Sequence, residues 1–138
     1  MKISILSHKA MQITSEDDVV LVRREVRALA QGQGFDSFAT AAVTTAASEL
    51  TRNVFVHARS GEVDIDVVSD GRRNGLRVTF RDKGPGIADI DRAMRGGYST
   101  ARSLGLGLSG SKRLVDEFTL QSIVGTGTTV TFVKWKPF

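Results

Sequence analysis

Polar and hydrophobic residues alternate with a period of two in two neighbouring stretches of the chain, 62–69 and 75–81. This period predicts β-strands that each bury one side. The connection 70–75 contains two glycines and an asparagine, which is typical of a hairpin turn. The apolar side of the first strand consists of Val63, Ile65 and Val67, and that of the second consists of Leu76, Val78 and Phe80.

Two more strands are predicted near the C-terminus, over 118–124 and 128–135, and the turn Gly125-Thr126-Gly127 joins them. Near the N-terminus, residues 11–14 are expected to form a short strand, whereas residues 1–9 carry little signal. The strands are therefore expected to form two hairpins and one separate strand.

Hydrophobic residues recur every three to four positions in three other stretches, which predicts helices. The first helix follows Ser15-Glu16-Asp17-Asp18, a variant of the capping box, and ends at Gly32 and Gly34. The second is capped by Asp36 or Ser37 and continues to about His57, and the third covers about 107–116. The apolar stripe of the second helix consists of Val43, Ala47, Leu50 and Val54.

Three arginines, Arg23, Arg24 and Arg27, lie off the apolar side of the first helix. We interpret them as a solvent-exposed face, with a docking surface for a partner as the alternative. Together the elements predict an α+β fold, a two-layer sandwich with three helices on one face of a mixed, mostly antiparallel sheet. The length of 138 residues fits one domain over 1–138.

Composition and charge exclude several classes of function. The net charge is +4, but the basic residues are scattered over several elements, and one Trp and one Tyr offer few stacking platforms, which disfavours nucleic-acid binding. The absence of cysteine excludes disulfides and thiolate metal sites. No apolar run approaches membrane-spanning length, and the start is not signal-like, so we expect a cytoplasmic protein without a membrane partner.

A glycine-rich turn, Asp82-Lys83-Gly84-Pro85-Gly86, follows the second hairpin strand directly. A carboxylate at a strand end is held rigidly, and the two glycines let the backbone approach a flat ligand. A second glycine pair, Gly105 and Gly107, is expected to open the third helix, whose free N–H groups suit a phosphate. The alternative for each motif by itself is an ordinary turn.

Glu49 and Asn53 stand four residues apart on the second helix, so they project along one line that flanks the apolar stripe. By themselves they would be read as an exposed polar face. Residues 87–104 separate the two glycine turns and contain a predicted short helix over 89–95. We interpret this stretch as a short lid over a ligand, with a plain surface loop as the alternative.

In this order the motifs resemble the GHKL ATPase superfamily, which has the Bergerat nucleotide-binding fold. The motifs are Glu-x-x-x-Asn (49–53), Asp-x-Gly-x-Gly (82–86), Gly-x-Gly (105–107) and Gly-Thr (127–128). The segments 48–54, 97–100, 105–108 and 112–118 are more closely similar to the RsbT family of serine/threonine kinases, relatives of the anti-sigma-factor kinases. The resemblance covers the chain from about Ser15 onward.

The resemblance implies an ATP site that uses Mg²⁺. Asp82 would accept a hydrogen bond from adenine, Gly84, Gly86 and Ile87 would shape the purine slot, and Thr128 would support the same edge. Asn53 would be a ligand of Mg²⁺, Gly105, Leu106 and Gly107 would contact the phosphates, and Glu49 would be the general base. The sequence does not rank the further phosphate contacts among Ser99, Thr100, Arg102, Ser103, Ser109 and Lys112.

The function that the resemblance implies is an Mg-ATP-dependent serine/threonine protein kinase. Its substrate would be a STAS-domain protein, and the released kinase would activate a PP2C-type phosphatase in a partner-switching pathway. One alternative is an anti-sigma-factor kinase that binds a sigma subunit, and another is a regulatory module that binds ATP without catalysis. The oligomeric state is left open.

Overall fold

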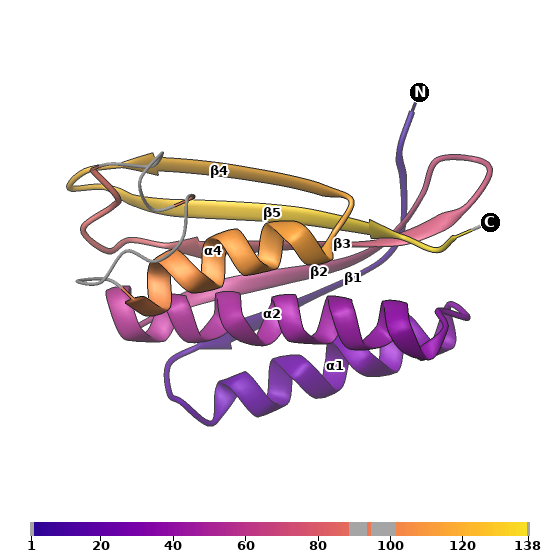
Figure 1. Cartoon of the computed structure of the whole chain (residues 1–138), viewed down its shortest axis with the longest axis horizontal. Coiled ribbons are helices and arrows are strands. Elements are labelled where there is room, and N and C mark those ends of the chain that lie inside the picture. The colour runs from indigo at the N-terminus through magenta and orange to yellow at the C-terminus, as the bar shows by residue number, and fades with distance from the viewer. Residues whose placement is uncertain (1, 89–93, 95–101, 138) are drawn as a thin grey trace.

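A computed structural model describes residues 2–88, 94 and 102–137. Three helices and five strands are described, and both termini lie at the same end of the molecule (Figure 1). The elements follow in the order β1 (Ser4–Ile13), α1 (Asp18–Gly32), α2 (Ser37–Ala58), β2 (Gly61–Ser69), β3 (Asn74–Asp82), α4 (Arg102–Leu114), β4 (Glu117–Ile123) and β5 (Gly127–Trp135).

The strands form one sheet in the order β1-β2-β3-β5-β4. The predicted α+β class is confirmed, with one correction, because all four strand pairings are antiparallel and the sheet is not mixed. Strands β3 and β4 are joined through α4 and run parallel to each other. Because β5 lies between them, this crossover creates no parallel pair.

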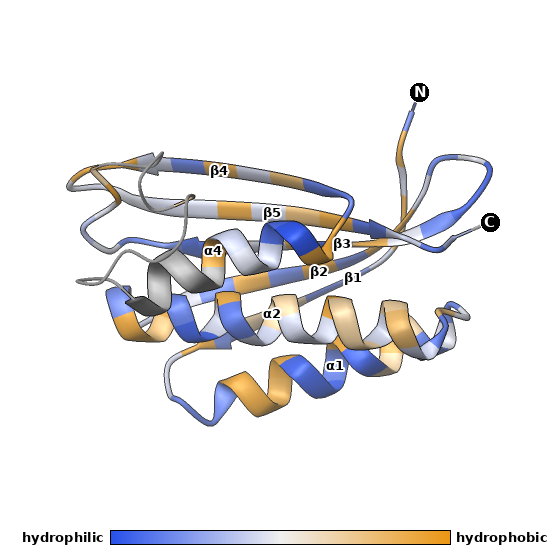
Figure 2. Ribbon diagram, viewed as in Figure 1, coloured by the Kyte–Doolittle hydropathy of each residue, from blue (hydrophilic) through white to orange (hydrophobic). Residues whose placement is uncertain are grey.

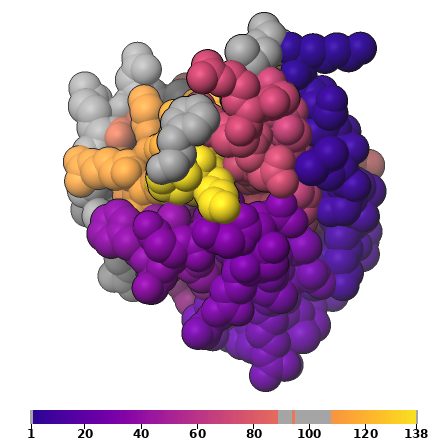
Figure 3. Space-filling view, turned by 90° about the vertical axis from the view of Figure 1, so that its right-hand side faces the viewer, coloured from indigo at the N-terminus to yellow at the C-terminus, as the bar shows by residue number. Residues whose placement is uncertain are grey.

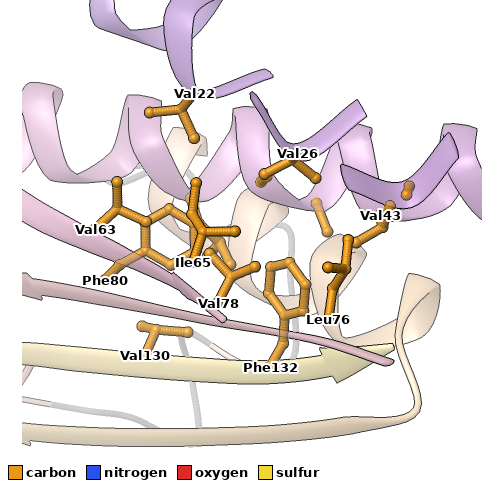
Figure 4. Packing of buried hydrophobic residues seen from close by; sticks show 14 of the residues in the cluster. Val22, Val26, Val43, Val63, Ile65, Leu76, Val78, Phe80, Val130 and Phe132 are labelled. Carbon is orange, nitrogen blue, oxygen red and sulfur yellow. The ribbon is translucent and has the colours of Figure 1, made fainter. Parts of the chain in front are cut away.

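The helices lie on one face of the sheet, with α2 between α1 and α4 (Figure 1). The predicted apolar stripe of α2 is buried throughout and packs on the alternate apolar residues of β2, β3 and β5 (Figure 4). The rings of Phe80 and Phe132 lie 6.2 Å apart between centroids in this layer. Figure 2 shows the alternating hydropathy along the strands, and α2 is more hydrophilic toward its C-terminal end.

Strand β1 is longer than predicted, since it covers Ser4–Ile13 and not only 11–14. It is an edge strand, and most of its residues are exposed on both faces, so no alternation marks it in the sequence. Its pairing with β2 runs from Ser4 opposite Ser69 to Ile13 opposite Gly61, with a register shift between Ile5 and Ser7.

The two helix starts differ from each other. Of the two predicted caps of α2, Asp36 and Ser37, Asp36 is the one that caps the helix, and its Oδ1 accepts the N–H of Ala39 at 2.7 Å. At α1 the cap position is Asp17, which makes no side-chain cap bond, so the predicted cap at Ser15 is wrong. Only the reverse half of a capping box forms, in which Asp18 Oδ2 accepts the N–H groups of Thr14 at 2.8 Å and Ser15 at 3.0 Å. These bonds lower the pKa of Asp18.

The third predicted helix begins earlier than expected, at Arg102, so the prediction that Gly105 or Gly107 opens it is wrong. A helical glycine costs only about 1 kcal/mol relative to alanine, so the pair does not prevent an upstream start. Gly105 falls in the first turn, where backbone N–H groups lack a helical partner, and Gly107 falls in the second turn.

The face of the sheet away from the helices carries a second small cluster of Val68, Val133 and Trp135. The indole Nε1 of Trp135 donates to Glu117 Oε2 at 2.7 Å, and the Arg73 guanidinium lies 5.0 Å from the ring centroid. At this end the C-terminal residues lie between the β2–β3 connection and the α1–α2 region (Figure 3). Asn74 holds them in place, because its O accepts the N–H of Lys136 at 2.8 Å and its Nδ2 donates to Gln33 at 2.8 Å.

No helix among the described residues is both long and apolar enough to cross a membrane.

Candidate functional site

A cavity lies where α2 and β3 end and β4 turns into β5, at the end of the molecule opposite both termini (Figure 1). Its volume of about 80 Å³ is several times the roughly 10–15 Å³ that one water needs. Most of the wall is apolar, and Asn53, His57, Asp82 and Thr128 supply the polar side chains. The apolar lining consists of Leu50, Val54, Phe80, Pro85, Ile87, Leu108 and Val130, with Gly86 beside them.

Asn53 is 7% exposed, and its side chain faces this cavity. Both Oδ1 and Nδ2 are buried without a hydrogen-bond partner among the described residues. A buried amide left unpaired costs about 1–3 kcal/mol, so a partner beyond the described residues is expected to complete it. The predicted site residue Asn53 therefore lines the cavity, and neither of its polar side-chain atoms is paired within the described part of the chain.

Glu49 lies one helical turn from Asn53, about 6 Å along α2, but it does not line the cavity. Its side chain is 41% exposed, and Oε1 accepts from Arg52 Nη1 at 3.2 Å. No described residue donates to Oε2. The helix thus places the amide inside the cavity and the carboxylate outside it, where a second molecule can approach.

His57 continues the same line of α2, four residues after Asn53, and none of the sequence motifs marks it as a site residue. Its Nε2 is buried without a hydrogen-bond partner among the described residues. Burial lowers the pKa of His57, and the charge of Asp82 opposes this shift in part. The spacing of Glu49, Asn53 and His57 was the signal that could have identified it.

The lowered pKa predicts how stability changes with pH. In a slightly acidic solution the unfolded chain binds a proton at His57 more readily than the folded chain does, so the free energy of unfolding rises with pH. The rise ends near the ordinary histidine pKa of about 6.5. Urea unfolding at a series of pH values should show this slope in the wild type and a smaller one in His57→Gln. Equal slopes in both proteins would refute the assignment.

Asp82 lies at the end of β3, as the alternation predicted, and two backbone groups hold its carboxylate. Oδ1 accepts the N–H of Gly84 at 2.9 Å and that of Thr128 at 3.3 Å. No described residue donates to Oδ2. One oxygen therefore fixes the orientation of the carboxylate, and the other is available to a ligand.

The β4–β5 turn holds the loop after Asp82 closely. Gly125 donates its N–H to Pro85 O at 2.9 Å, and Ser122 Oγ accepts the N–H of Ile87 at 2.7 Å. Gly86 has a φ of 80°, and a Cβ there would lie 2.5 Å from Ile123 O. Gly127 has a φ of 142°, and a Cβ there would lie 2.1 Å from Asp82 O. Only glycine fits these two positions, and both allow the loop and the turn to pack together.

The structure gives contacts for only some of the remaining predicted site residues. Gly84 packs against Ala58 at the end of α2, where a Cβ would lie 2.7 Å from the alanine Cβ. Gly105, Leu106 and Gly107 belong to α4, and the next residue, Leu108, lines the cavity. Most of the proposed lid, 89–93 and 95–101, lies outside the described residues.

A family model described as a histidine kinase-like ATPase domain matches residues 14–134. The chain therefore belongs to the histidine kinase-like ATPase family, as the order of its motifs indicated.

Among curated proteins, the chain is 43% identical over 125 residues to the serine/threonine-protein kinase RsbT of Bacillus subtilis, a match that covers 91% of this chain and 94% of RsbT. It is 31% identical to the anti-sigma F factor of Anoxybacillus flavithermus, over 67% of this chain and 66% of that protein. The prediction that the chain groups with the protein serine/threonine kinases of this family is thus confirmed.

A solved structure of the RsbU and RsbW domains of a Mycobacterium tuberculosis protein has a similar fold, with a TM-score of 0.62 and 21% identity. The similarity covers 94% of this chain and 33% of the other. At that identity the structure supports the fold alone.

Proposed function

We propose that the chain is a protein serine/threonine kinase that binds ATP in this cavity with Mg²⁺ and transfers the γ-phosphate to a separate protein. One observation carries the proposal. Asn53 and Asp82 line the same cavity, the Asn53 amide and Asp82 Oδ2 have no hydrogen-bond partner among the described residues, and Glu49 lies one helical turn from Asn53 outside the cavity. The family membership supports the use of ATP.

The base of ATP would enter the apolar part of the cavity. Ile87, Leu50 and Val130 offer flat apolar contacts to a purine, and Asp82 Oδ2 accepts a hydrogen bond from the exocyclic amino group of adenine. Thr128 lies on the same edge, because its N–H is bonded to the other oxygen of Asp82. The triphosphate would then extend past Asn53 toward the first turn of α4, where Gly105 would donate an N–H group.

The donor set around Asn53 fits Mg²⁺. No group of three His, Asp or Glu side chains in the described part of the chain could hold a metal by itself. Mg²⁺ is commonly bound by one or two protein oxygens together with substrate phosphates and water, and the unpaired Oδ1 of Asn53 supplies such an oxygen. When bound there, the ion would neutralise charge on the phosphates.

Glu49 would act as the general base. A hydroxyl of the protein substrate attacks the γ-phosphorus, the bond from that phosphorus to the bridging oxygen breaks, and ADP leaves with the electron pair. The hydroxyl proton passes to Glu49 Oε2. No described residue donates a hydrogen bond to this oxygen, so it can accept the proton. The exposed position of Glu49 suits this role, because the substrate is another protein that must approach from solvent.

The proposed substrate is a STAS-domain protein, and the second proposed partner is a PP2C-type phosphatase that the released kinase activates in the cytoplasm. These partners rest on the similarity to RsbT over most of both chains. The similarity to anti-sigma F factors favours one further candidate, a kinase that binds a sigma subunit.

Incubation of the protein with Mg-ATP and a STAS-domain protein tests the activity directly. We expect the intact mass of the STAS protein to rise by one phosphate, located on a serine or threonine by fragmentation. Binding of ATP without transfer to any STAS protein would leave a regulatory ATP-binding module and would contradict the kinase. Preferential capture of a sigma subunit over a phosphatase would favour the anti-sigma alternative.

A further inference from the structure

An open groove of about 520 Å³ runs between α1 and α2. The two helices pack side by side and run in opposite directions (Figure 1). Most of the side chains that line the groove are exposed, so a macromolecule can reach it. The lining includes Arg27 and Gln31 from α1 and Thr40, Ala41, Thr44 and Thr45 from α2.

The exposed side of α2 leads from this groove to Glu49. Thr45 lines the groove and precedes Glu49 by four residues, so the two lie about 6 Å apart along the helix axis. Ala41 and Phe38 continue the same line at spacings of four and three residues, and both are exposed. A protein that presents a hydroxyl to Glu49 therefore has this side of α2 directly beside it.

Phe38 is the most exposed large hydrophobic residue in the described part of the chain, at 83%. It stands beside the groove, since Ser37 and Ala41 both line it. An aromatic side chain in water is a typical anchor of a protein interface. Phe38 precedes Glu49 by eleven residues, or roughly 16 Å along the helix, a span that one interface of ordinary size covers.

The groove is positively charged. Arg27 is the charged residue of its lining, and Arg23 and Arg24 are exposed one turn earlier on α1. In the described part of the chain the ion pair of α1 joins Glu25 to Lys9, so none of the three arginines is neutralised by a carboxylate there. Charge complementarity therefore favours a partner with acidic side chains.

We propose that the groove between α1 and α2 is the docking surface for the protein substrate, which binds through an acidic segment beside its target serine or threonine. Phe38 anchors the substrate, Arg27 pairs with its carboxylates, and the target hydroxyl then reaches Glu49. The inference rests on the proposed function, because it places the substrate relative to the general base. The arginines of α1 then form a docking face, the alternative that the sequence left open.

Steady-state phosphate transfer from Mg-ATP to the STAS-domain protein tests this surface. The KM for the STAS-domain protein should rise about 10- to 30-fold in Arg27→Glu and in Phe38→Ala, because one change replaces attraction by repulsion and the other removes an anchor. The kcat and the affinity for ATP should stay at the wild-type values, since neither residue lines the nucleotide cavity.

The controls separate docking from a merely structural effect. Arg113→Glu makes the same charge change at an exposed position of α4, and Ile5→Ala removes a side chain that is 56% exposed on β1. Both should keep the wild-type KM, and Phe38→Leu should recover most of the loss. Added NaCl should raise the KM of the wild type by screening, and the rise should be smaller in Arg27→Glu. Thermal melting by circular dichroism confirms that each variant is folded.

The outcomes distinguish the two proposals. A wild type that transfers no phosphate overturns the proposed function and this inference with it. Transfer by the wild type, combined with an unchanged KM in folded Arg27→Glu or Phe38→Ala, overturns the docking surface alone. A lower kcat or a lower ATP affinity at unchanged KM has the same consequence. A dimer that Phe38→Ala dissociates, measured by light scattering, would assign the groove to a second copy of the chain and also contradict the inference.

Discussion

Glu49→Gln is expected to lower the rate of phosphate transfer to a protein substrate by about 10²- to 10⁴-fold, the usual contribution of a general base. Affinity for ATP should stay within about twofold of the wild type, since Glu49 does not line the cavity. Glutamine keeps the shape and the contact with Arg52 but cannot take the proton. The fold should be unaffected, because the side chain is 41% exposed and its ion pair with Arg52 lies on the surface.

The measurement is single-turnover transfer of labelled phosphate from ATP to the STAS-domain protein, with ATP affinity titrated in parallel. Glu25→Gln is a matched control, because Glu25 is also a helical glutamate in a surface ion pair, with Lys9. It should transfer phosphate at the wild-type rate. Full activity in Glu49→Gln would remove Glu49 from the chemistry, and loss of ATP binding would place it in the nucleotide site instead.

Asp82→Asn is expected to weaken ATP binding by about 10- to 100-fold, which corresponds to the 1.5–3 kcal/mol of a hydrogen bond to a charged group. The amide oxygen can still accept from Gly84 and Thr128, so the loop should keep its shape. The amide nitrogen then meets the adenine amino group, and two donors face each other.

Asp116→Asn provides the control for this titration. The carboxylate of Asp116 likewise accepts a backbone N–H, from Trp135 at 2.7 Å, but it lies outside the cavity. Its ATP affinity should equal that of the wild type. If Asp82→Asn binds ATP as tightly as the wild type does, Asp82 is not the group that reads adenine.

Local patterns in the sequence predicted much of the fold. The stripe from Val43 to Val54 and the start of α2 at Asp36 or Ser37 depend only on neighbours within a few turns, and the structure confirms the stripe and selects Asp36 as the cap. Strand β1 was predicted too short because an exposed edge strand needs no alternation. The sheet was predicted to be mixed because a strand-helix-strand order does not reveal that β5 inserts between β3 and β4.

The candidate site was likewise predicted only in part, because motif order is local and packing between elements is not. Asn53 and Asp82 could be recognised from motif order, and the structure places both at one cavity. The separation of Glu49 from that cavity depends on how α2 is rotated against the sheet, which helical spacing alone does not fix. The bond between the Ile87 N–H and Ser122, which holds the loop after Asp82, could not be predicted, because it spans 35 residues.

Calorimetric titration of the wild-type protein with ATP, in the presence and absence of Mg²⁺, tests the central claim most directly. We expect one ATP to bind per chain, more tightly with Mg²⁺ than without, and we expect Asn53→Ala to remove the gain that Mg²⁺ provides. Absence of ATP binding at millimolar nucleotide, or binding that neither Asp82→Asn nor Asn53→Ala alters, would contradict the assignment of this cavity as the nucleotide site.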